Sequence, residues 1–304
     1  MYAAIDIGGT KIAAGLVDAD GVLLTRHERP TPAVEPMAAV EGLLAQLAAD
    51  PGWEQAGAVG IGSAGPIDAA KGTISPLNIP AWRDFPLVAR VADATGRPVT
   101  LAGDGVAMAA GEHWRGAAKG RENVLCMVVS TGVGGGLILG GKLRPGPSGN
   151  AGHVGHICVE LDGPPCPCGA RGCVEVIASG TAIAARAVRE GWQRPGGGPA
   201  SEATAAEVAE SARAGDPIAL ASYDRSAKAI AAAIAGTAAL VDMEAAVIGG
   251  GVAKSGEVLF APLRKHLKEY ARLSFTRDVT VHPAALGGDA GLIGAAALVG
   301  HAAI

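Results

Sequence analysis

The sequence predicts an α/β protein built from two lobes. Predicted strands and helices alternate through the first 120 residues, which is typical of an α/β lobe. The strand–glycine–strand pattern of residues 2–25 returns at residues 123–143, so we expect an internal duplication. A chain of 304 residues is too long for one small core and suits one large domain or two ordinary ones.

The first predicted lobe starts with a β-hairpin. Residues 1–25 give two strands around the Gly8-Gly9 turn, with a second turn at Asp20-Gly21. The segments that follow are a helix over 34–50, a strand over 57–67, a helix over 84–95 and a strand over 98–105.

The second half is largely helical between residues 179 and 241. Thr204 and Glu207 have the spacing of a capping box, and Asp216-Pro217 reads as an N-cap followed by proline at the first helical position. The remaining segments are a loop over 191–200, a strand over 245–251, a helix over 256–272, a strand over 279–284 and a closing helix from 289.

These elements suggest where the two lobes begin and end. We expect a small α/β lobe of residues 1–113 and a large α/β lobe of residues 114–287. The C-terminal helix, residues 288–304, is expected to pack back on the small lobe.

Composition excludes several classes of function. Apolar residues make up 49% and charged residues 18%, a globular composition, and the net charge of −4 comes without a Lys/Arg run. We therefore expect a small-molecule partner, with no nucleic acid and no membrane. The N-terminus has no apolar signal segment and residues 229–241 read as a buried helix, so we expect a cytoplasmic protein.

Residues 150–175 concentrate metal-binding side chains. Cys166, Cys168 and Cys173 follow His156, and three thiolates with one imidazole make a closed tetrahedral set typical of a structural Zn²⁺ site. The alternative is three unrelated buried thiols. An odd total of five cysteines argues against a disulfide framework, and we expect Cys126 and Cys158 to be plain core residues.

Three predicted strands end in glycine-rich corners, where backbone N–H groups can approach an anion closely. Each alone is weak evidence for a phosphate site, whereas three on a duplicated α/β pattern are stronger. Asp6 suits an Mg²⁺-bound water, while Thr10 and Lys11 suit phosphate oxygens. The candidate nucleotide-binding residues are Asp6, Gly8, Gly9, Thr10, Lys11, Thr131, Gly132, Gly134, Gly249, Gly250 and Gly251.

The spacing of these glycines matches neither a P-loop nor a GxGxxG fingerprint. We therefore expect the nucleotide to lie in a cleft between two lobes.

Taken together, the motifs resemble the ROK family of sugar kinases and sugar-responsive repressors, from residue 5 to residue 296. The motifs that carry the resemblance are "DIGGTK", "GIGSAGPID", "SPLNIPAW", "STGVGGG", "CPCGARGCVE" and "LGGDAGLIGAA". The resemblance implies an actin-like ATPase fold of the hexokinase/ribonuclease H type, with two lobes and an active-site cleft. It also implies ATP, Mg²⁺, a sugar substrate and a homo-oligomer, either a dimer or a tetramer.

The resemblance also implies roles for individual residues. His156, Cys166, Cys168 and Cys173 fall on the family's zinc ligands in order and spacing. The metal would organise the loop that carries His156 and Glu175, both of which are expected to contact the sugar.

Asp104 falls on the family's catalytic base, at the end of a small-lobe strand. A carboxylate there can accept the proton of a sugar hydroxyl while the γ-phosphoryl group of ATP transfers. The alternative is that Asp104 only caps a helix that begins near residue 106.

The chain departs from the glucose-phosphorylating members at three positions. His153 replaces a glutamate, while Gly103 and Val106 replace asparagines on either side of Asp104. A pocket that loses hydrogen-bond partners for substrate hydroxyls discriminates against the substrate that carries those hydroxyls. We therefore expect glucose to be a poor substrate. An amino sugar or a seven-carbon cyclitol is favoured, and the alternative is that His153 is a surface or core residue in an ordinary glucokinase.

Other sugar-site positions match the family. Asn78 and Glu175 are expected to contact the sugar through their side chains, and Gly65 through its backbone. The residues expected around the substrate are thus Gly65, Asn78, Gly103, Asp104, His153, His156 and Glu175.

Two readings other than a kinase remain. A family repressor would carry an N-terminal helix-turn-helix, and we expect none because the phosphate motif begins at Asp6. A non-catalytic sugar sensor would fit the changed residues around Asp104, but the retained Asp6, Asp104 and glycine corners argue against it.

Overall fold

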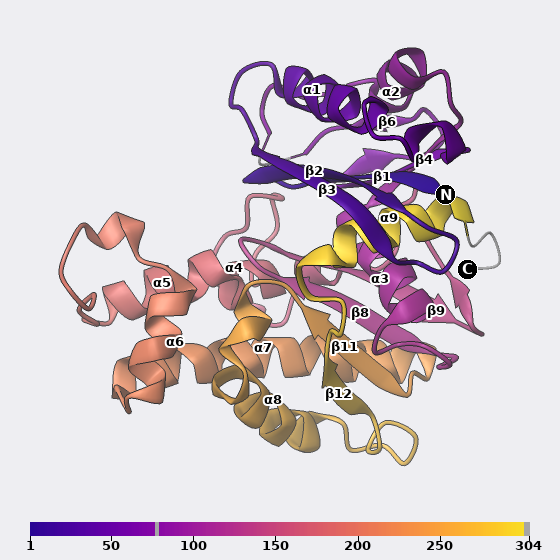
Figure 1. The fold of residues 1–304 in the computed structure, drawn as a ribbon. Coiled ribbons are helices and arrows are strands. Elements are labelled where there is room, and N and C mark those ends of the chain that lie inside the picture. The colour runs from indigo at the N-terminus through magenta and orange to yellow at the C-terminus, as the bar shows by residue number, and fades with distance from the viewer. Residues whose placement is uncertain (77–78, 301–304) are drawn as a thin grey trace. The chain divides into compact units, whose positions relative to one another are not determined.

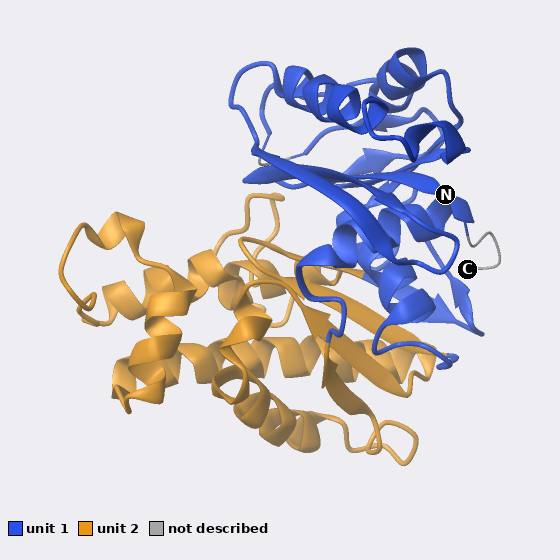
Figure 2. Ribbon diagram, viewed as in Figure 1, with its two compact units in different colours: residues 1–122, 136–152, 284–304 blue, residues 123–135, 153–283 orange. Residues whose placement is uncertain are grey.

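The computed structural model describes residues 1–76 and 79–300. The described chain divides into two compact units, drawn in blue and orange in Figure 2. The first unit comprises residues 1–122, 136–152 and 284–300, and the second comprises residues 123–135 and 153–283.

A five-stranded sheet forms the centre of the first unit, in the order β3-β2-β1-β4-β7. Its strands are β1 (Tyr2–Ile7), β2 (Lys11–Val17), β3 (Leu23–Pro30), β4 (Val59–Ser63) and β7 (Val99–Gly103). The first three are antiparallel neighbours, whereas β1, β4 and β7 run parallel. Because parallel strands end at the same edge, the sheet gathers the residues that follow β1, β4 and β7.

Helices cover both faces of this sheet (Figure 1). The helices of the unit are α1 (Pro36–Ala48), α2 (Leu87–Thr95), α3 (Asp104–Arg115) and α9 (Ala290–Gly300). A core that includes Ile5, Ile12, Leu43 and Leu87 joins the sheet to α1 and α2. The opposite face packs on α9, which also lies against α3.

Glycine permits the close packing of α9. A Cβ at Gly60 of β4 would lie 1.8 Å from the carbonyl oxygen of Ala295, and a Cβ at Gly294 would lie 1.9 Å from that of Ala107. No side chain fits at such distances, so the small residues of this C-terminal helix are required by its contact with the sheet and with α3.

Glu112 holds the turn before α9. Its buried carboxylate accepts hydrogen bonds from the backbone N–H groups of Ala117 (2.7 Å), Ala285 (3.1 Å) and Leu286 (2.9 Å). A buried charge needs such partners to offset its loss of hydration.

The second sheet has the order β10-β9-β8-β11-β12. Its strands are β8 (Val124–Val129), β9 (Val133–Leu139), β10 (Lys142–Leu143), β11 (Ala245–Gly249) and β12 (Thr280–Pro283). Strands β8, β11 and β12 are parallel neighbours, and β9 pairs with β10 in antiparallel register. The carboxyl ends of β8 and β11 therefore meet.

Helices of the second unit surround the long α7. The helices are α4 (Val174–Ala178), α5 (Gly180–Arg189), α6 (Ala205–Arg213), α7 (Pro217–Val241) and α8 (Glu257–Tyr270). All four others pack on α7. Residues 229–241, expected as a buried helix, form its second half, and none of the described helices is long and apolar enough to cross a bilayer.

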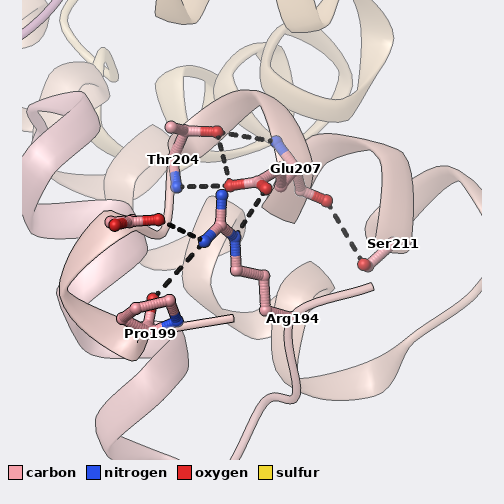
Figure 3. A network of polar contacts seen from close by, with 6 residues as sticks. Arg194, Pro199, Thr204, Glu207 and Ser211 are labelled. Carbon is pink, nitrogen blue, oxygen red and sulfur yellow. Dashed lines mark hydrogen bonds and ion pairs between the residues drawn. The ribbon is translucent and has the colours of Figure 1, made fainter. Parts of the chain in front are cut away.

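Both predicted helix starts are confirmed. Thr204 and Glu207 form the reciprocal capping box of α6, and the Asp216 side chain accepts from Ala219 N at the start of α7. Figure 3 shows that Glu207 also binds Arg194, whose Nε lies 2.7 Å from Glu207 Oε1. This network fixes the loop between α5 and α6.

Three features differ from the sequence expectation. The hairpin is a three-stranded meander, because β3 continues through the polar run Arg26–Arg29 at the edge of the sheet, where one side of the strand meets water. A small two-stranded sheet, β5 (Ile67–Asp68) with β6 (Thr73–Ile74), was not expected. Cys158 was predicted in the core and is exposed, whereas Cys126 is buried as predicted.

Candidate functional site

The first glycine corner is a turn between β1 and β2 that its own hairpin holds. Gly8 N donates to the carbonyl of Lys11 (2.9 Å), and the carbonyl of Gly8 accepts from Thr31 Oγ1 (2.7 Å). Thr31 N donates to the carbonyl of Thr10 (3.0 Å). The exposed Lys11 ammonium lies 3.3 Å from Glu28 Oε2. Gly9 and Thr10 complete the turn. The residues of this corner that were predicted to bind phosphate are therefore adjacent to one another.

Asp6 lies at the carboxyl end of β1, opposite Gly62 of β4. Burial raises its pKa to about 6, although the positive charges of Lys11 and Arg26 oppose that shift. A Cβ at Gly291, in the first turn of α9, would lie 2.3 Å from Asp6 Oδ2. The Asp6 carboxylate therefore occupies the space that a side chain at position 291 would fill.

Asp104 begins α3 directly after β7. Gly103 is the N-cap residue and pairs with Ser63 of β4, while Asp104 Oδ1 accepts from Gly105 N at 2.7 Å. The helix thus begins at residue 104, and Asp104 lies in its first turn rather than capping a helix that begins near residue 106. A carboxylate in the first turn is stabilised by the helix dipole.

Asp6 and Asp104 flank the same glycine. A Cβ at Gly62 would lie 4.0 Å from Asp6 Oδ1 and 4.0 Å from Asp104 Cα. Two acidic residues therefore lie at the carboxyl ends of β1 and β7, on either side of β4. Gly65, in the loop after β4, is joined to Pro66 by a cis peptide bond, and Asn78 lies outside the described residues.

The two replaced positions beside Asp104 have different surroundings. A Cβ at Gly103 would meet no atom within 4 Å among the described residues, and its φ of −63° suits any residue. Val106 is buried and lines a cavity of about 220 Å³. The other lining residues are Ala69, Thr100, Leu101, Ala102, Leu143, Pro145, Gly146, Gly149 and Leu298.

His156, Cys166, Cys168 and Cys173 converge in the second unit. Their ligand atoms all lie within 4.8 Å of one another. Cys166 Sγ lies 3.7 Å from His156 Nδ1, and Cys168 Sγ lies 3.8 Å from Cys173 Sγ. Tetrahedral zinc with Zn–S bonds of about 2.3 Å places sulfur atoms about 3.8 Å apart. The four residues therefore fit Zn²⁺.

The electrostatics of the thiols favour a cation at this cluster. Burial raises the pKa of Cys173 to about 12 and raises that of Cys166, while the backbone N–H of Ala170 lowers that of Cys168. Buried thiols of this kind become thiolates when a metal ion supplies compensating charge.

His153 stacks on His156, a residue of the His/Cys cluster. Its ring is 5.7 Å from that of His156, with 18° between the planes. The turn between the two histidines packs on the start of β9, since a Cβ at Gly155 would lie 2.0 Å from the carbonyl oxygen of Val133.

The second glycine corner is the loop of residues 130–132 between β8 and β9. Ser130 N donates to the carbonyl of Gly132 (2.8 Å), and Glu175 Oε2 accepts from Val133 N (2.9 Å). Glu175 belongs to α4, whose N-cap is the cluster residue Cys173. Gly134 lies inside β9 rather than in the loop, although its position was predicted as part of a glycine turn.

The third corner, Gly249–Gly251, follows β11 and lies beside the second. A Cβ at Gly251 would lie 3.5 Å from Ser130 Oγ, and one at Gly250, with a φ of 92°, would lie 2.4 Å from the carbonyl oxygen of Val129. Only glycine fits that position. The second unit thus brings together Thr131, Glu175, the two histidines and the third corner.

Two contributors to the first corner were not predicted from the sequence. Arg26 pairs with Asp289 and binds the carbonyl of Gly288 (3.2 Å), so β3 holds the turn before α9. Gly291 leaves room for the Asp6 carboxylate. The glycines at positions 291 and 294 of a helical segment were the available signal, because that spacing makes one face of the helix flat.

Comparisons with known proteins agree on one family. A model of the ROK family matches residues 2–302. A glucokinase of Thermotoga maritima is 38% identical, over 97% of this chain and 96% of its own. An N-acetylmannosamine kinase of Escherichia coli is also 38% identical, over 97% of each chain. The structure of a ROK glucokinase from Streptomyces griseus, in complex with glucose and AMPPNP, matches with a TM-score of 0.85, at 37% identity over 98% of each chain.

Proposed function

Because the chain belongs to the ROK family and has its actin-like ATPase fold, we propose that it is an ATP-dependent sugar kinase. The phosphoryl group would go to the hydroxyl equivalent to the C6 hydroxyl of a hexose or hexose-like substrate. The observation that carries the proposal is the pair of acids, Asp6 and Asp104, on either side of Gly62 at the carboxyl ends of parallel strands.

Asp104 is proposed as the general base. Its Oδ1 accepts a hydrogen bond from Gly105 N, and an ionised carboxylate is an acceptor of several hydrogen bonds, among which a substrate hydroxyl would be one. Accepting that proton as the γ-phosphoryl group of ATP leaves would make the hydroxyl oxygen a better nucleophile.

Asp6 is proposed to orient Mg²⁺ through bound water, and the metal ion would neutralise charge on the transferring phosphoryl group. Thr10, Lys11 and the N–H groups of Gly8 and Gly9 would bind phosphate oxygens. Thr131, Gly132, Gly134 and Gly249–Gly251 would bind the rest of the nucleotide.

The cluster of His156 with the three cysteines is proposed to hold structural Zn²⁺. Three thiolates and one imidazole would supply all four ligands of a tetrahedral Zn²⁺, which would leave no position for a reacting water. Cys173 is the N-cap residue of α4, and Glu175 lies two residues later. The cluster would therefore fix the place of Glu175 beside the sugar.

For the substrate, we favour an amino sugar or a seven-carbon cyclitol over glucose. The open space at Gly103 and the apolar cavity beside Val106 leave room where glucose-specific relatives place asparagine side chains. His153 offers an imidazole in place of a carboxylate, which changes the hydrogen bonds available to a substrate.

An ordinary glucokinase is the second candidate. The stacking of His153 on His156 favours it, because a histidine held by the metal cluster can be structural.

Two enzyme assays separate these candidates. ADP release with Mg·ATP should be compared across glucose, mannose, N-acetylmannosamine, 3-amino hexoses and valiolone-type cyclitols. We expect kcat/KM to be highest for an amino sugar or a cyclitol. The double variant Gly103→Asn, His153→Glu should raise kcat/KM for glucose about thirtyfold, since it restores two hydrogen bonds of about 1 kcal/mol each.

Asp104→Asn provides the blank for background ATP hydrolysis. A wild-type protein that prefers glucose would establish the glucokinase reading. Failure of every acceptor to stimulate ADP release would remove the kinase proposal.

A further inference from the structure

The loop of residues 130–132 is held by a segment far along the chain. Three bonds reach it from α4 and α5. Gly180 N donates to the carbonyl of Ser130 (2.7 Å), Thr181 Oγ1 donates to the carbonyl of Thr131 (3.0 Å), and Glu175 accepts from Val133 N (2.9 Å). Each end of the loop is therefore fixed by this segment, residues 175–181, rather than by the loop's own turn alone.

The direction of the hydroxyl bonds follows from chemistry. The carbonyl of Thr131 can only accept, so the Thr181 hydroxyl donates to it. Ser179 Oγ lies 2.9 Å from Thr181 Oγ1 and must then donate its own proton to Thr181. Ser179 Oγ also accepts from Ala182 N (3.2 Å) as the N-cap of α5. The start of the helix thus fixes the rotamer that Thr181 uses.

The segment is itself anchored on α7. Arg186 of α5 is buried and donates to the carbonyls of Ile177 (2.9 Å) and Ser222 (2.6 Å). Ser226 of α7 donates to the carbonyl of Ala178 (2.9 Å). Burial lowers the pKa of Arg186 to about 10, which still leaves it charged at neutral pH. The segment of residues 175–181 is therefore held in place by α5 and α7, independently of the loop that it supports.

Because the peptide group is planar, the bonds that hold these carbonyls also fix the direction of the N–H groups that follow them. The carbonyl of one residue and the N–H of the next lie in one plane and point in opposite directions. Holding the carbonyls of Ser130 and Thr131 toward α5 therefore directs the N–H groups of Thr131 and Gly132 away from α5. Among the described residues, neither of these two N–H groups has a hydrogen-bond acceptor.

We propose that Thr181 is a positioning residue for the nucleotide, which orients the N–H group of Gly132 toward a phosphate group by holding the carbonyl of Thr131, while Gly180 N holds the preceding peptide in the same way. The proposal rests on the proposed function for the identity of the anion. Thr181 touches the loop and not the ligand, so it sets nucleotide affinity rather than the chemistry at the sugar.

Thr181 is exposed, so its variants should fold. Thr181→Val keeps the shape and removes the hydroxyl, while Thr181→Ser keeps the hydroxyl and is the matched control. Binding of Mg·ADP and of a non-hydrolysable ATP analogue is measured by calorimetry without sugar. We expect Thr181→Val to weaken binding about threefold to tenfold, the range for one hydrogen bond, and Thr181→Ser to change it less than twofold.

Steady-state kinetics give the second readout. In Thr181→Val, KM for ATP should rise with KM for the sugar unchanged, and the melting temperature and zinc content should stay at their wild-type values. Equal nucleotide affinity of the Val and Ser variants would overturn the proposal. A parallel rise of both KM values would also overturn it, because a merely structural role predicts that result.

The two assays also separate this proposal from the proposed function. If no sugar is phosphorylated while Thr181→Val alone weakens nucleotide binding, the kinase assignment is wrong and the positioning role stands. If a sugar is phosphorylated and Thr181→Val binds nucleotide like the wild type, the positioning role is wrong and the kinase assignment stands.

Discussion

The first and second glycine corners look alike in sequence but are supported differently. In the first, Gly8 bonds to Lys11 and Thr31 within one meander of antiparallel strands. In the second, the carbonyls of Ser130 and Thr131 bond to residues of α5, 50 positions further along the chain in the case of Thr131 and Thr181. A repeated local motif can therefore depend on its own hairpin in one unit and on distant tertiary contacts in the other.

The two corners also differ in charge. The first contains Asp6 and Lys11, with Asp104 on the other side of Gly62 from Asp6, whereas the second lies beside Glu175 of α4, whose N-cap residue is Cys173. We therefore expect changes near the first corner to affect chemistry and charge directly. Changes near the second should act through the position of its loop.

The largest expected effect is at Asp104. Asp104→Asn keeps an acceptor for Gly105 N but loses the basicity needed to take a proton. We expect kcat to fall by about 10² to 10⁴, the usual contribution of a general base, with nucleotide affinity within about twofold of the wild type. Stopped-time ADP release and calorimetry check the two expectations. A kcat above a tenth of the wild-type value would remove Asp104 from the role of base.

We expect the buried carboxylate of Asp6 to lower the stability of the fold while serving the proposed function. Its pKa is about 6 in the folded protein and 3.8 as the reference value, so folding favours the protonated form. The charged form therefore costs stability above pH 6, and this cost disappears as the pH falls from 6 to 3.8. Asp6→Asn should raise the free energy of unfolding at pH 8 by up to about 3 kcal/mol, and at pH 4 by only about 0.5 kcal/mol.

Urea unfolding at both pH values, without magnesium, tests this expectation. Asp20→Asn at an exposed turn makes the same change of charge and serves as the control. An equal shift in the two variants, or a shift of Asp6→Asn that is as large at pH 4 as at pH 8, would contradict the desolvation cost. If Asp6→Asn loses Mg·ATP binding and Asp20→Asn does not, the buried carboxylate is retained for nucleotide binding despite its cost in stability.

We expect removal of the metal to disturb the second glycine corner and to leave the first unchanged. Cys168 is the exposed ligand of the cluster, so Cys168→Ser leaves the buried packing intact. We expect bound zinc to fall and both sugar and nucleotide binding to weaken by about tenfold to a hundredfold, because Cys173 caps the helix that carries Glu175.

Elemental analysis and calorimetry are the measurements for this variant. Cys158→Ser is the control, since Cys158 is an exposed cysteine outside the four ligands. Stoichiometric zinc in Cys168→Ser would show that the cluster holds metal without this thiol. Normal nucleotide affinity after zinc loss would show that α4 keeps its place without the metal.

The sequence was most informative where the signal is local. The capping box of Thr204 and Glu207 and the N-cap at Asp216 involve residues a few positions apart, and both were predicted correctly. The edge strand over Arg26–Arg29 was missed, because at an edge the polar side chains look like a loop. Cys158 was misplaced because cysteine is usually buried, and the isolated β-bridge that it forms with Cys173 could not be inferred from spacing.

The candidate site was predictable as a set of residues but not as an arrangement. The order of His156 and the cysteines indicated the cluster, and the structure brings their ligand atoms together. The bonds from Gly180 and Thr181 to the loop join residues about 50 positions apart, and no local pattern encodes such a contact. Strand pairing and helix packing decide it.

The smallest expected effect is at Thr31, and it tests the comparison of the two corners most directly. Thr31→Val removes the 2.7 Å bond to the carbonyl of Gly8 but leaves the bond from Gly8 N to Lys11 and the bond from its own N–H to Thr10. The turn therefore keeps two of its hairpin contacts. We expect nucleotide affinity, measured by the same calorimetry, to fall less than about twofold, below the fall for Thr181→Val. Thr31→Ser is the matched control, and an equal loss of affinity in Thr31→Val and Thr181→Val would mean that both corners depend on a side-chain hydroxyl, so that the hairpin alone does not hold the first.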